Sequence, residues 1–229
     1  MSAYFITATG TDIGKTFVAS GLLRHLRAQG KVVAGIKPVI SGFDIAKARA
    51  SDTGELLDAM GEVVTPEAVE QISPWRFAAP LSPDMAAARE GKAIDFDALV
   101  AYCRDAAAWP GTLLIEGVGG VMVPLDASHT VLDWMAALGL PAILVAGSYL
   151  GTISHTLTAA NAMAQAGVKL AALVLNDSGD GAVPLDDTVE TLRRFLPETP
   201  LVVLPRGAGE ADFSRLADEL FQRDSKNTP

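Results

Sequence analysis

Short runs of apolar residues alternate along the chain with longer segments whose apolar residues recur every three or four positions. Residues 3–7 form the first run, and Val18, Leu22 and Leu26 then follow at helical spacing up to Gly30. This order predicts a strand followed by a helix. Further runs cover residues 32–36, 112–116, 141–146, 170–175 and 200–204. Because these runs are nearly continuous rather than alternating, they are typical of strands buried on both faces of a parallel sheet.

Helical spacing of apolar residues fills most intervals between these runs. The expected helices cover residues 95–108, 131–138, 152–166 and 186–196, and a last one contains Phe213, Leu216 and Leu220. Alternating strands and helices predict an α/β fold, in which residues 1–229 form a single domain with a doubly wound, mostly parallel sheet of about six or seven strands. Residues 42–94 are weakly patterned and rich in alanine and proline, so we expect an excursion beside the sheet.

Composition and charge narrow the range of partners. With 229 residues, 49% of them apolar, the chain can bury a full core. Its net charge of −9 disfavours binding by broad neutralisation of nucleic-acid or lipid phosphates, so we expect a small-molecule partner, with no nucleic acid and no membrane. The single cysteine, Cys103, lies in a helical pattern and excludes an intrachain disulfide. No signal-peptide pattern opens the sequence, and we expect a soluble, cytoplasmic protein.

Residues 6–17, ITATGTDIGKTF, contain the tripeptide Gly-Lys-Thr at 14–16, between the first predicted strand and the first predicted helix. A phosphate-binding loop of the common pattern has a glycine five positions before the glycine of this tripeptide. Here that position is Thr9, and the nearest glycine, Gly10, is one residue too close. The sequence therefore indicates a phosphate loop of an unusual variant.

The remaining parts of such a loop are present. Lys15 can reach the β- and γ-phosphates of a nucleotide, and the Thr16 hydroxyl, at the start of the helix, can bind Mg²⁺. The alternative is a simple helix start, with Thr11 or Asp12 as its cap and Lys15 in solvent. The position between the first strand and the first helix favours phosphate binding.

Polar side chains at two other strand ends are candidates for the chemistry, since ligands gather at the carboxyl ends of parallel strands. Lys37 ends one run and is followed closely by Ser41, so an ammonium group and a hydroxyl would lie at the same edge as the phosphate loop. A strand-terminal lysine in solvent is an equally good interpretation of Lys37. Glu116 ends another run and leads into Gly117 and Gly119. A carboxylate beside such flexible backbone suits a Mg²⁺ ligand next to a closely bound molecule, and a paired glutamate in a glycine-rich turn is the alternative.

Three further segments remain open from the residues alone. Asp52, three residues before Glu55, is typical of a helix cap. The pair Asn176 and Asp177 follows a predicted strand and could either contact adenine or form an Asx turn. The amides of residues 151–154 begin a predicted helix and form a potential carboxylate site.

Several of these segments together resemble the dethiobiotin synthetase family, and the likeness runs along almost the whole chain. In the family's order the sequence contains GTDIGKT, GIKPVISG, SDTGEL, RFAAPLSP, AAAREGKAI, LLIEGVGGVMVPL, LPAILVAGSYLGTISHTL and LVLND. The family's phosphate loop is one residue longer than the common pattern, which accounts for the displaced glycine. Ala8 stands where the family has glycine, and Asp12 stands where glutamate is frequent.

The resemblance implies a P-loop NTPase fold and an enzyme that needs ATP and Mg²⁺. Its reaction closes a ureido ring on 7,8-diaminopelargonate with carbon dioxide, through a carbamate and a carbamic-phosphoric anhydride, and it releases dethiobiotin, ADP and phosphate. The family works as a homodimer, and the resemblance implies the same assembly here, in which the substrate carboxylate is held by amides of a second subunit.

The resemblance also implies a role for each matching residue. The catalytic residues would be Lys37, Lys15 and Asp12, and Mg²⁺ would be bound by Thr16, Asp52 and Glu116. The nucleotide would contact Asp12, Ile13, Gly14, Lys15, Thr16, Phe17, Glu116, Gly117, Gly119, Asn176, Asp177, Pro205 and Arg206. The substrate would contact Ser41, Gly151, Thr152, Ile153 and Ser154.

Other protein classes share parts of this pattern. Switch-type ATPases that sort plasmids or position division sites usually carry an early lysine in the loop, and no lysine precedes Lys15. An ATP-dependent amidase domain of cobalamin synthesis would normally carry a nucleophilic cysteine in a further domain, whereas Cys103 lies in a helical pattern. A binding module without catalysis is a further alternative if Ala8 prevents nucleotide binding.

Overall fold

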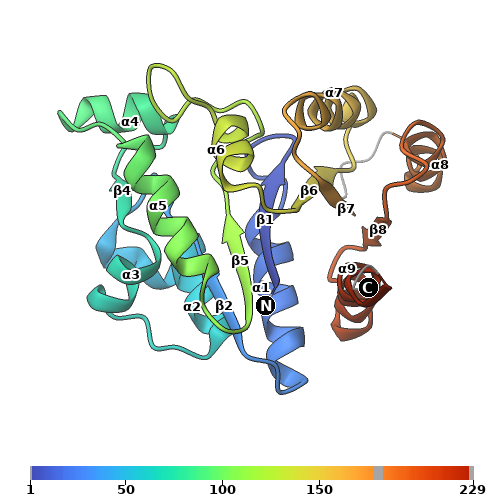
Figure 1. The fold of residues 1–229 in the computed structure, drawn as a ribbon, viewed down its shortest axis with the longest axis horizontal. Coiled ribbons are helices and arrows are strands. Elements are labelled where there is room, and N and C mark those ends of the chain that lie inside the picture. The colour runs from blue at the N-terminus through green and yellow to red at the C-terminus, as the bar shows by residue number, and fades with distance from the viewer. Residues whose placement is uncertain (1, 178–182, 227–229) are drawn as a thin grey trace.

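The computed structural model describes residues 2–177 and 183–226, and its centre is a six-stranded sheet (Figure 1). The strands are β1 (Ser2–Ala8), β2 (Val33–Ile36), β5 (Thr112–Glu116), β6 (Ala142–Gly147), β7 (Leu170–Asn176) and β8 (Leu201–Leu204). Their order across the sheet is β2-β5-β1-β6-β7-β8, and all neighbouring pairs are parallel. The predicted parallel α/β sheet is confirmed. Every residue of β5 and of β6 is buried, as continuous apolar runs require.

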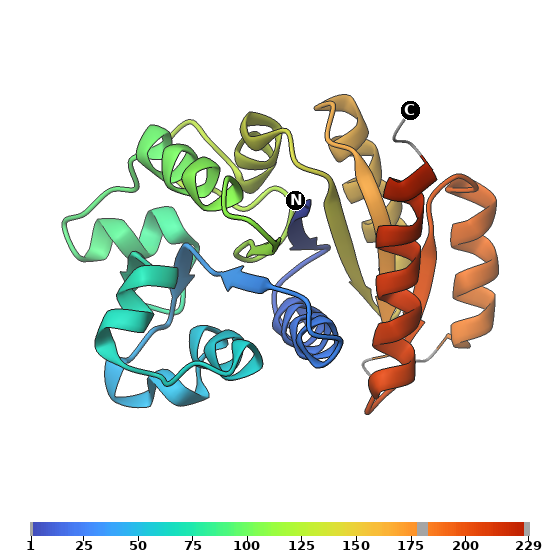
Figure 2. The ribbon, with the colours of Figure 1, turned by 60° about the horizontal axis from the view of Figure 1, so that its bottom comes forward.

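Helices cover both faces of this sheet (Figure 2). On one face, α1 (Lys15–Ala28) packs between α2 (Asp52–Met60) and α9 (Glu210–Lys226). The other face is covered by α5 (Phe96–Ala107), α6 (Val131–Leu138) and α7 (Thr152–Gln165), with α8 (Leu185–Phe195) beside α7. The bounds of these helices differ from the predicted ones by at most one residue wherever both ends were predicted. In the described part of the chain, no helix combines the length and the apolar character needed to span a bilayer.

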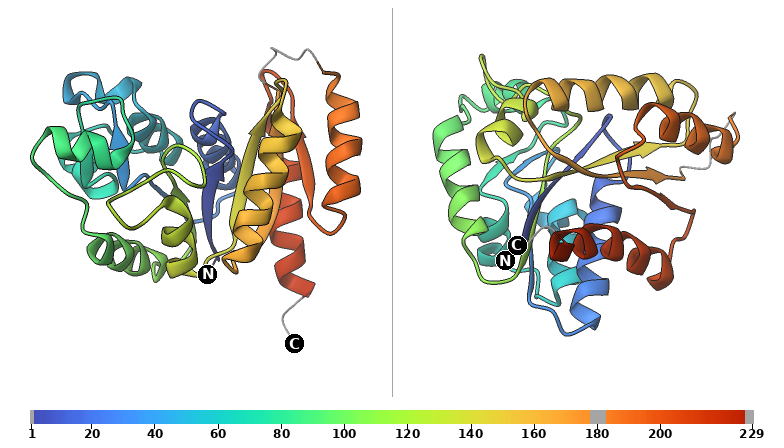
Figure 3. Two further views of the ribbon diagram at one scale, coloured as in Figure 1. Left: turned by 90° about the horizontal axis from the view of Figure 1, so that it is seen from above. Right: turned by 45° about the vertical axis from the view of Figure 1, so that its right-hand side comes forward.

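Residues 42–94 contain more regular structure than the sequence predicted. They hold the 3-10 helix η1 (Ile45–Ala50), α2, α3 (Pro66–Ile72), the strand β4 (Trp75–Phe77) and α4 (Pro83–Arg89). The strand β3 (Val39–Ser41) pairs in parallel with β4 as a separate two-stranded sheet. Figure 3 shows this region beside the main sheet, so its predicted position is right. The weak apolar pattern left these elements unpredicted, because short helices here begin at local caps such as Ser51 and Thr65 rather than at a long apolar repeat.

The turn between β1 and α1 depends on two residues with positive φ. Asp12 has φ 57° and Gly14, the residue that precedes α1, has φ 103°. The Asn176 side chain donates a hydrogen bond from Nδ2 to the Ile13 carbonyl at 3.0 Å, which joins this turn to the end of β7. No side chain caps α1, so the predicted alternative of a cap by Thr11 or Asp12 is wrong.

The glycine that the resemblance leads us to expect at position 8, where this chain has Ala8, is not needed for this backbone. Ala8 is the last residue of β1, fully buried, and the described residues with positive φ do not include it. Gly10 is not among them either, and a Cβ added there would meet only Ile13, at 3.7 Å or more. The chain therefore forms the loop without the left-handed conformation that a glycine at position 8 would permit.

We predict opposite outcomes for alanine at the two glycines of this turn. Gly14→Ala should lower the free energy of unfolding by about 1–3 kcal/mol, because position 14 is left-handed. In addition, a Cβ there would lie 2.3 Å from Asn176 Nδ2. Gly10→Ala should be neutral or stabilise by up to about 1 kcal/mol through the unfolded state. Urea unfolding of both variants would measure this, and equal destabilisation would contradict the assigned backbone conformations.

Candidate active site

A cavity of about 370 Å³ opens at the carboxyl ends of β1, β2 and β5. It is lined by Thr11, Asp12, Gly14, Lys15, Thr16, Lys37, Ile40, Ser41, Asp52, Val118 and Gly119. The volume lies in the range of small-molecule sites. Segments far apart in the sequence meet here, as the predicted gathering of strand ends requires.

The register of two strands brings a lysine and a glutamate together. Ile36 of β2 lies opposite Ile115 of β5, so the next residues, Lys37 and Glu116, emerge side by side at the same edge of the sheet. Lys37 Nζ lies 2.6 Å from Glu116 Oε1. Only 3% of Lys37 and 1% of Glu116 are exposed, so the alternative of a solvated lysine is wrong.

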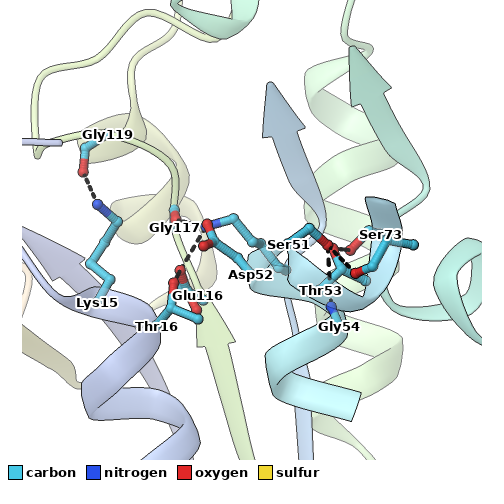
Figure 4. Close-up of polar contacts among 12 residues, drawn as sticks. Lys15, Thr16, Ser51, Asp52, Thr53, Gly54, Ser73, Glu116, Gly117 and Gly119 are labelled. Atoms are coloured by element: carbon cyan, nitrogen blue, oxygen red, sulfur yellow. Dashed lines mark hydrogen bonds and ion pairs between the residues drawn. The ribbon is translucent and has the colours of Figure 1, made fainter. Parts of the chain in front are cut away.

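Asp52 and Thr16 complete a polar network around this pair (Figure 4). Lys37 Nζ lies 2.8 Å from Asp52 Oδ2, and Thr16 Oγ1 donates to Glu116 Oε1 at 2.7 Å. The cap of α2 is Ser51, whose hydroxyl accepts a hydrogen bond from the Gly54 amide. The interpretation of Asp52 as only a cap is therefore wrong. Its carboxylate, at the start of α2, is directed toward the end of β2.

The charges of this network reinforce one another. Burial alone would lower the pKa of Lys37, but the adjacent Glu116 and Asp52 carboxylates outweigh it and raise this pKa above its ordinary value. Burial likewise acts to raise the pKa of Asp52, and Lys37 outweighs it, so that this pKa is lowered. Lys37 is therefore a firmly protonated ammonium group.

The oxygen atoms around Glu116 suit a hard divalent cation. Glu116 Oε2 is buried and has no hydrogen-bond partner among the described residues, although buried carboxylate oxygens rarely lack one. The Thr16 hydroxyl donates a hydrogen bond to Glu116. The Asp52 carboxylate lies beside Lys37, which is the ion-pair partner of Glu116. Within the described ranges, no group of three or more histidine, cysteine, aspartate or glutamate residues could hold a metal ion. A cation here would therefore use two carboxylates and a hydroxyl, with other oxygens from bound phosphate or water, which fits Mg²⁺.

Lys15 lies in the cavity and binds main-chain carbonyls of two loops, its own and the one that follows β5. Its Nζ donates to the Gly119 carbonyl at 2.8 Å and to the Gly10 carbonyl at 3.2 Å. Burial lowers the pKa of Lys15 to about 8, and the nearby Lys37 acts in the same direction, against Glu116 and Asp52. A phosphate group entering the cavity could replace the two carbonyls as the partner of this ammonium group.

The residues predicted to contact adenine lie together at the next strand ends. Asn176 is opposite Leu204 in the sheet, so Asn176 and Asp177 adjoin Pro205 and Arg206. Asn176 contacts the phosphate loop through the Ile13 carbonyl, and Asp177 accepts a hydrogen bond from the Ser148 hydroxyl at 2.9 Å. None of these four residues lines the 370 Å³ cavity, so they flank it rather than enclose it. Phe17 packs edge-on against Phe213 of α9.

The predicted carboxylate site is separate from the cavity within one chain. Ser41 lines the cavity, whereas Gly151, Thr152, Ile153 and Ser154 at the start of α7 do not. Gly151 has φ 100°, and no side chain among the described residues caps this helix start with a hydrogen bond.

Three cavity residues were missed as site residues by the sequence analysis. Thr11, Ile40 and Val118 line the cavity between the predicted polar residues. The sequence signal that could have found these three residues is their position, since each lies within two residues of a predicted site residue. Thr11 was considered only as a helix cap, and Ile40 and Val118 are apolar residues in segments whose polar residues were the candidates.

A protein-family model and curated sequence relatives both match most of this chain. The AAA domain family model matches residues 2–208. The chain is similar to the ATP-dependent dethiobiotin synthetase BioD of Acidiphilium cryptum, with 54% identity over 202 residues, 87% of this chain and 91% of that protein. It is also similar to the BioD protein of Caulobacter sp. strain K31, with 49% identity over 223 residues, 96% of this chain and 95% of that protein.

Solved structures share the fold at much lower identity. The septum site-determining protein MinD of Pyrococcus horikoshii, complexed with Mg-ADP, matches with a TM-score of 0.57 at 16% identity, over 99% of each chain. Chloroplast FtsY of Physcomitrella patens matches with a TM-score of 0.51 at 15% identity, over 96% of this chain and 65% of that one. These shared folds, together with the AAA domain family model, confirm the predicted P-loop NTPase type of fold, and the sequence relatives decide the family. The chain is an enzyme that belongs to the ATP-dependent dethiobiotin synthetase family.

Proposed function

We propose that this enzyme closes the ureido ring of dethiobiotin from 7,8-diaminopelargonate, carbon dioxide and ATP, with release of ADP and phosphate. The observation that carries the proposal is the buried Lys37–Glu116 pair, with its partner Asp52, in a cavity beside the phosphate loop. A protonated lysine and oxygen ligands for a cation next to a phosphate loop suit a reaction in which negative charge moves between a carboxylate and a phosphoryl group.

The nucleotide would occupy the loop and the adjoining strand ends. The phosphates would bind the amides of Asp12, Ile13 and Gly14 and the side chains of Lys15 and Thr16. Adenine would contact Asn176 and Asp177, flanked by Pro205 and Arg206. Phe17, Gly117 and Gly119 would complete the nucleotide contacts. The Gly119 carbonyl supports this, because it already accepts a hydrogen bond from Lys15 and lines the cavity.

Magnesium would be held by Thr16, Asp52 and Glu116. The Glu116 Oε2 atom supports this, because it is buried and has no hydrogen-bond partner within the described part of the chain. When bound, this ion would neutralise charge on the β- and γ-phosphates of ATP. Lys37 contacts both carboxylates and so holds their oxygen atoms next to the phosphate loop.

Ring closure would proceed in three balanced steps. One substrate amine forms a bond to the carbon of carbon dioxide and loses a proton, which gives a carbamate. A carbamate oxygen then bonds to the γ-phosphorus while the bond to ADP breaks. The second amine finally attacks the carbonyl carbon of this mixed anhydride, loses a proton and expels phosphate. Lys37 and Lys15 would stabilise the negative charge in each step, and the Asp12 carboxylate, which lines the cavity, would accept an amine proton.

The substrate would be positioned from two sides. Ser41 lines the cavity and would contact the carbamate or an amine. The substrate carboxylate would bind the amides of Gly151, Thr152, Ile153 and Ser154 from a second subunit, because the same residues of one chain do not line its cavity. We therefore propose a homodimer of single-domain protomers, residues 1–229, which acts on small molecules in the cytoplasm without nucleic acid or membrane.

A switch-type ATPase of the plasmid-partition or division-site class is the second candidate. The fold likeness to MinD favours it, although at 16% identity this likeness concerns the fold alone. Such a protein would hydrolyse ATP without closing a ureido ring.

We predict that purified protein with MgATP, labelled bicarbonate and 7,8-diaminopelargonate forms an acid-stable labelled product. Carbamates lose carbon dioxide in acid, whereas a ureido ring does not, so acid-stable label measures ring closure. The label should depend on every component and match the phosphate released. Phosphate release without acid-stable label would overturn the proposal and favour the switch-type ATPase.

We predict that Lys37→Ala lowers turnover by about 10²-fold or more, because it removes a cation from the site of charge transfer. Without Mg²⁺ the variant should also lose about 3 kcal/mol of unfolding free energy, since Glu116 is left buried without its partner. Mg²⁺ should stabilise this variant more than the wild type, because Lys37 no longer occupies the carboxylates.

Lys92→Ala is the matched control, since Lys92 pairs with Glu90 on the surface. This variant should change unfolding free energy by less than about 1 kcal/mol and keep full turnover. Thermal unfolding with and without Mg²⁺ and the label assay would measure both effects. Unaltered turnover of Lys37→Ala would disprove its catalytic role.

A further inference from the structure

Tyr149 joins two segments to which the proposed function gives separate tasks. It lies in the turn between β6 and α7, and its hydroxyl is 3.4 Å from Thr9 Oγ1, at the start of the phosphate loop. The same hydroxyl is 2.9 Å from His155 Nδ1 in the first turn of α7. One phenol therefore contacts both the nucleotide loop and the helix start proposed to hold the substrate carboxylate.

The phosphate loop makes a lysine contact next to Thr9, for which a bound phosphate would compete. In this structure Lys15 Nζ donates to the carbonyl of Gly10, the residue that follows Thr9. Phosphates in the loop would take over this ammonium group, and the Gly10 carbonyl would lose its partner. The Gly120 backbone packs closely on this segment, since a Cβ there would lie 3.3 Å from Gly10 Cα. Gly120 therefore limits movement of the Gly10 backbone on one side. A shift of Gly10 would move the adjacent residue, Thr9.

The other end of the contact is fixed to the start of α7. The His155 ring lies near Gly151, because a Cβ on Gly151 would be 3.7 Å from His155 Cε1. The Tyr149 carbonyl accepts a hydrogen bond from the Thr152 amide at 3.1 Å, and Thr152 Oγ1 donates to the Gly147 carbonyl at 2.6 Å. Tyr149 therefore shares hydrogen bonds with the same turn through its main chain and its side chain.

We propose that Tyr149 is a positioning residue that couples nucleotide occupancy of the phosphate loop to the order of the α7 start, through Thr9 and His155. This inference rests on the proposed function for its biological meaning. The element with two arrangements is Lys15, which pairs either with the Gly10 carbonyl or with phosphate, and coupling through it is reciprocal. In the proposed homodimer the α7 start serves the partner's cavity, so nucleotide in one subunit would prepare the substrate site of the other.

Amide hydrogen exchange of the wild type, Tyr149→Phe and Tyr102→Phe, with and without MgADP, tests the coupling. Tyr102→Phe is the matched control, since its hydroxyl donates to the Gln71 carbonyl, away from the cavity. MgADP should slow exchange of the amides of residues 150–155 at least about twofold in the wild type and the control, but not in Tyr149→Phe. Nucleotide affinity should change less than about threefold in the three proteins, since Tyr149 does not line the cavity.

Thr9→Val removes the other hydroxyl of the contact and provides a second variant. It should abolish the same protection, and the double variant with Tyr149→Phe should show no further loss, because both changes break one interaction. Equal protection in Tyr149→Phe and the wild type would overturn the proposal, and so would a wild type without any response to MgADP. This readout needs no substrate, so it remains decisive even if ring closure fails.

The steady-state readout separates coupling from a general loss of structure. At saturating ATP, Tyr149→Phe should raise the KM for 7,8-diaminopelargonate at least about threefold, with kcat within about twofold of the wild type. Tyr102→Phe should leave both constants unchanged. An equal fall of kcat in both variants would indicate a structural effect of losing a hydroxyl and would contradict the positioning role.

Discussion

The buried ion pair of Lys37 and Glu116 is the interaction on which the site depends. Removing two charges from water is costly, and such a pair persists only where the surrounding structure holds its geometry and supplies further partners. The parallel register of β2 and β5 sets this geometry, and Asp52 and Thr16 supply the partners. The position of α2 also follows, because its first residue must reach the end of β2. A more stable pair of apolar residues could fill this space, which suggests that the charges are kept for chemistry.

The phosphate loop is arranged around the same pair. Lys15 and Lys37 are close enough for each to disfavour the charge of the other, and Glu116 and Asp52 offset this repulsion. The two lysines and the Glu116 and Asp52 carboxylates nearly balance in charge before any ligand binds, and Asp12 adds one further carboxylate to the cavity. Phosphate charge therefore favours the release of Lys15 from the loop carbonyls while Lys37 stays paired. The two lysines have the same functional group but different partners, since Lys15 binds main-chain carbonyls and Lys37 binds carboxylates. Their different roles follow from these partners.

Sequence patterns predicted the parts of this fold that rest on long apolar repeats. Continuous apolar runs marked all six strands of the main sheet, and their polar ends marked Lys37 and Glu116. Burial of Lys37 could not be predicted, because the sheet order that places β2 beside β5 depends on contacts distant in sequence. The same limit applied to Asp52, whose spacing to Glu55 is typical of a cap although Ser51 performs that task. Residues 42–94 fold through short capped helices, for which periodicity is a weak signal.

The fold alone does not determine this chemistry. MinD shares the architecture at 16% identity, so the arrangement of strands and phosphate loop is compatible with more than one kind of protein. The groups proposed to act in this chain lie at the ends of β2, β5 and β6, where the sheet places a lysine, a glutamate and the turn with Tyr149. These three strand ends are not adjacent in sequence and share no local motif. Their chemistry can act together only because the parallel sheet brings them to one edge.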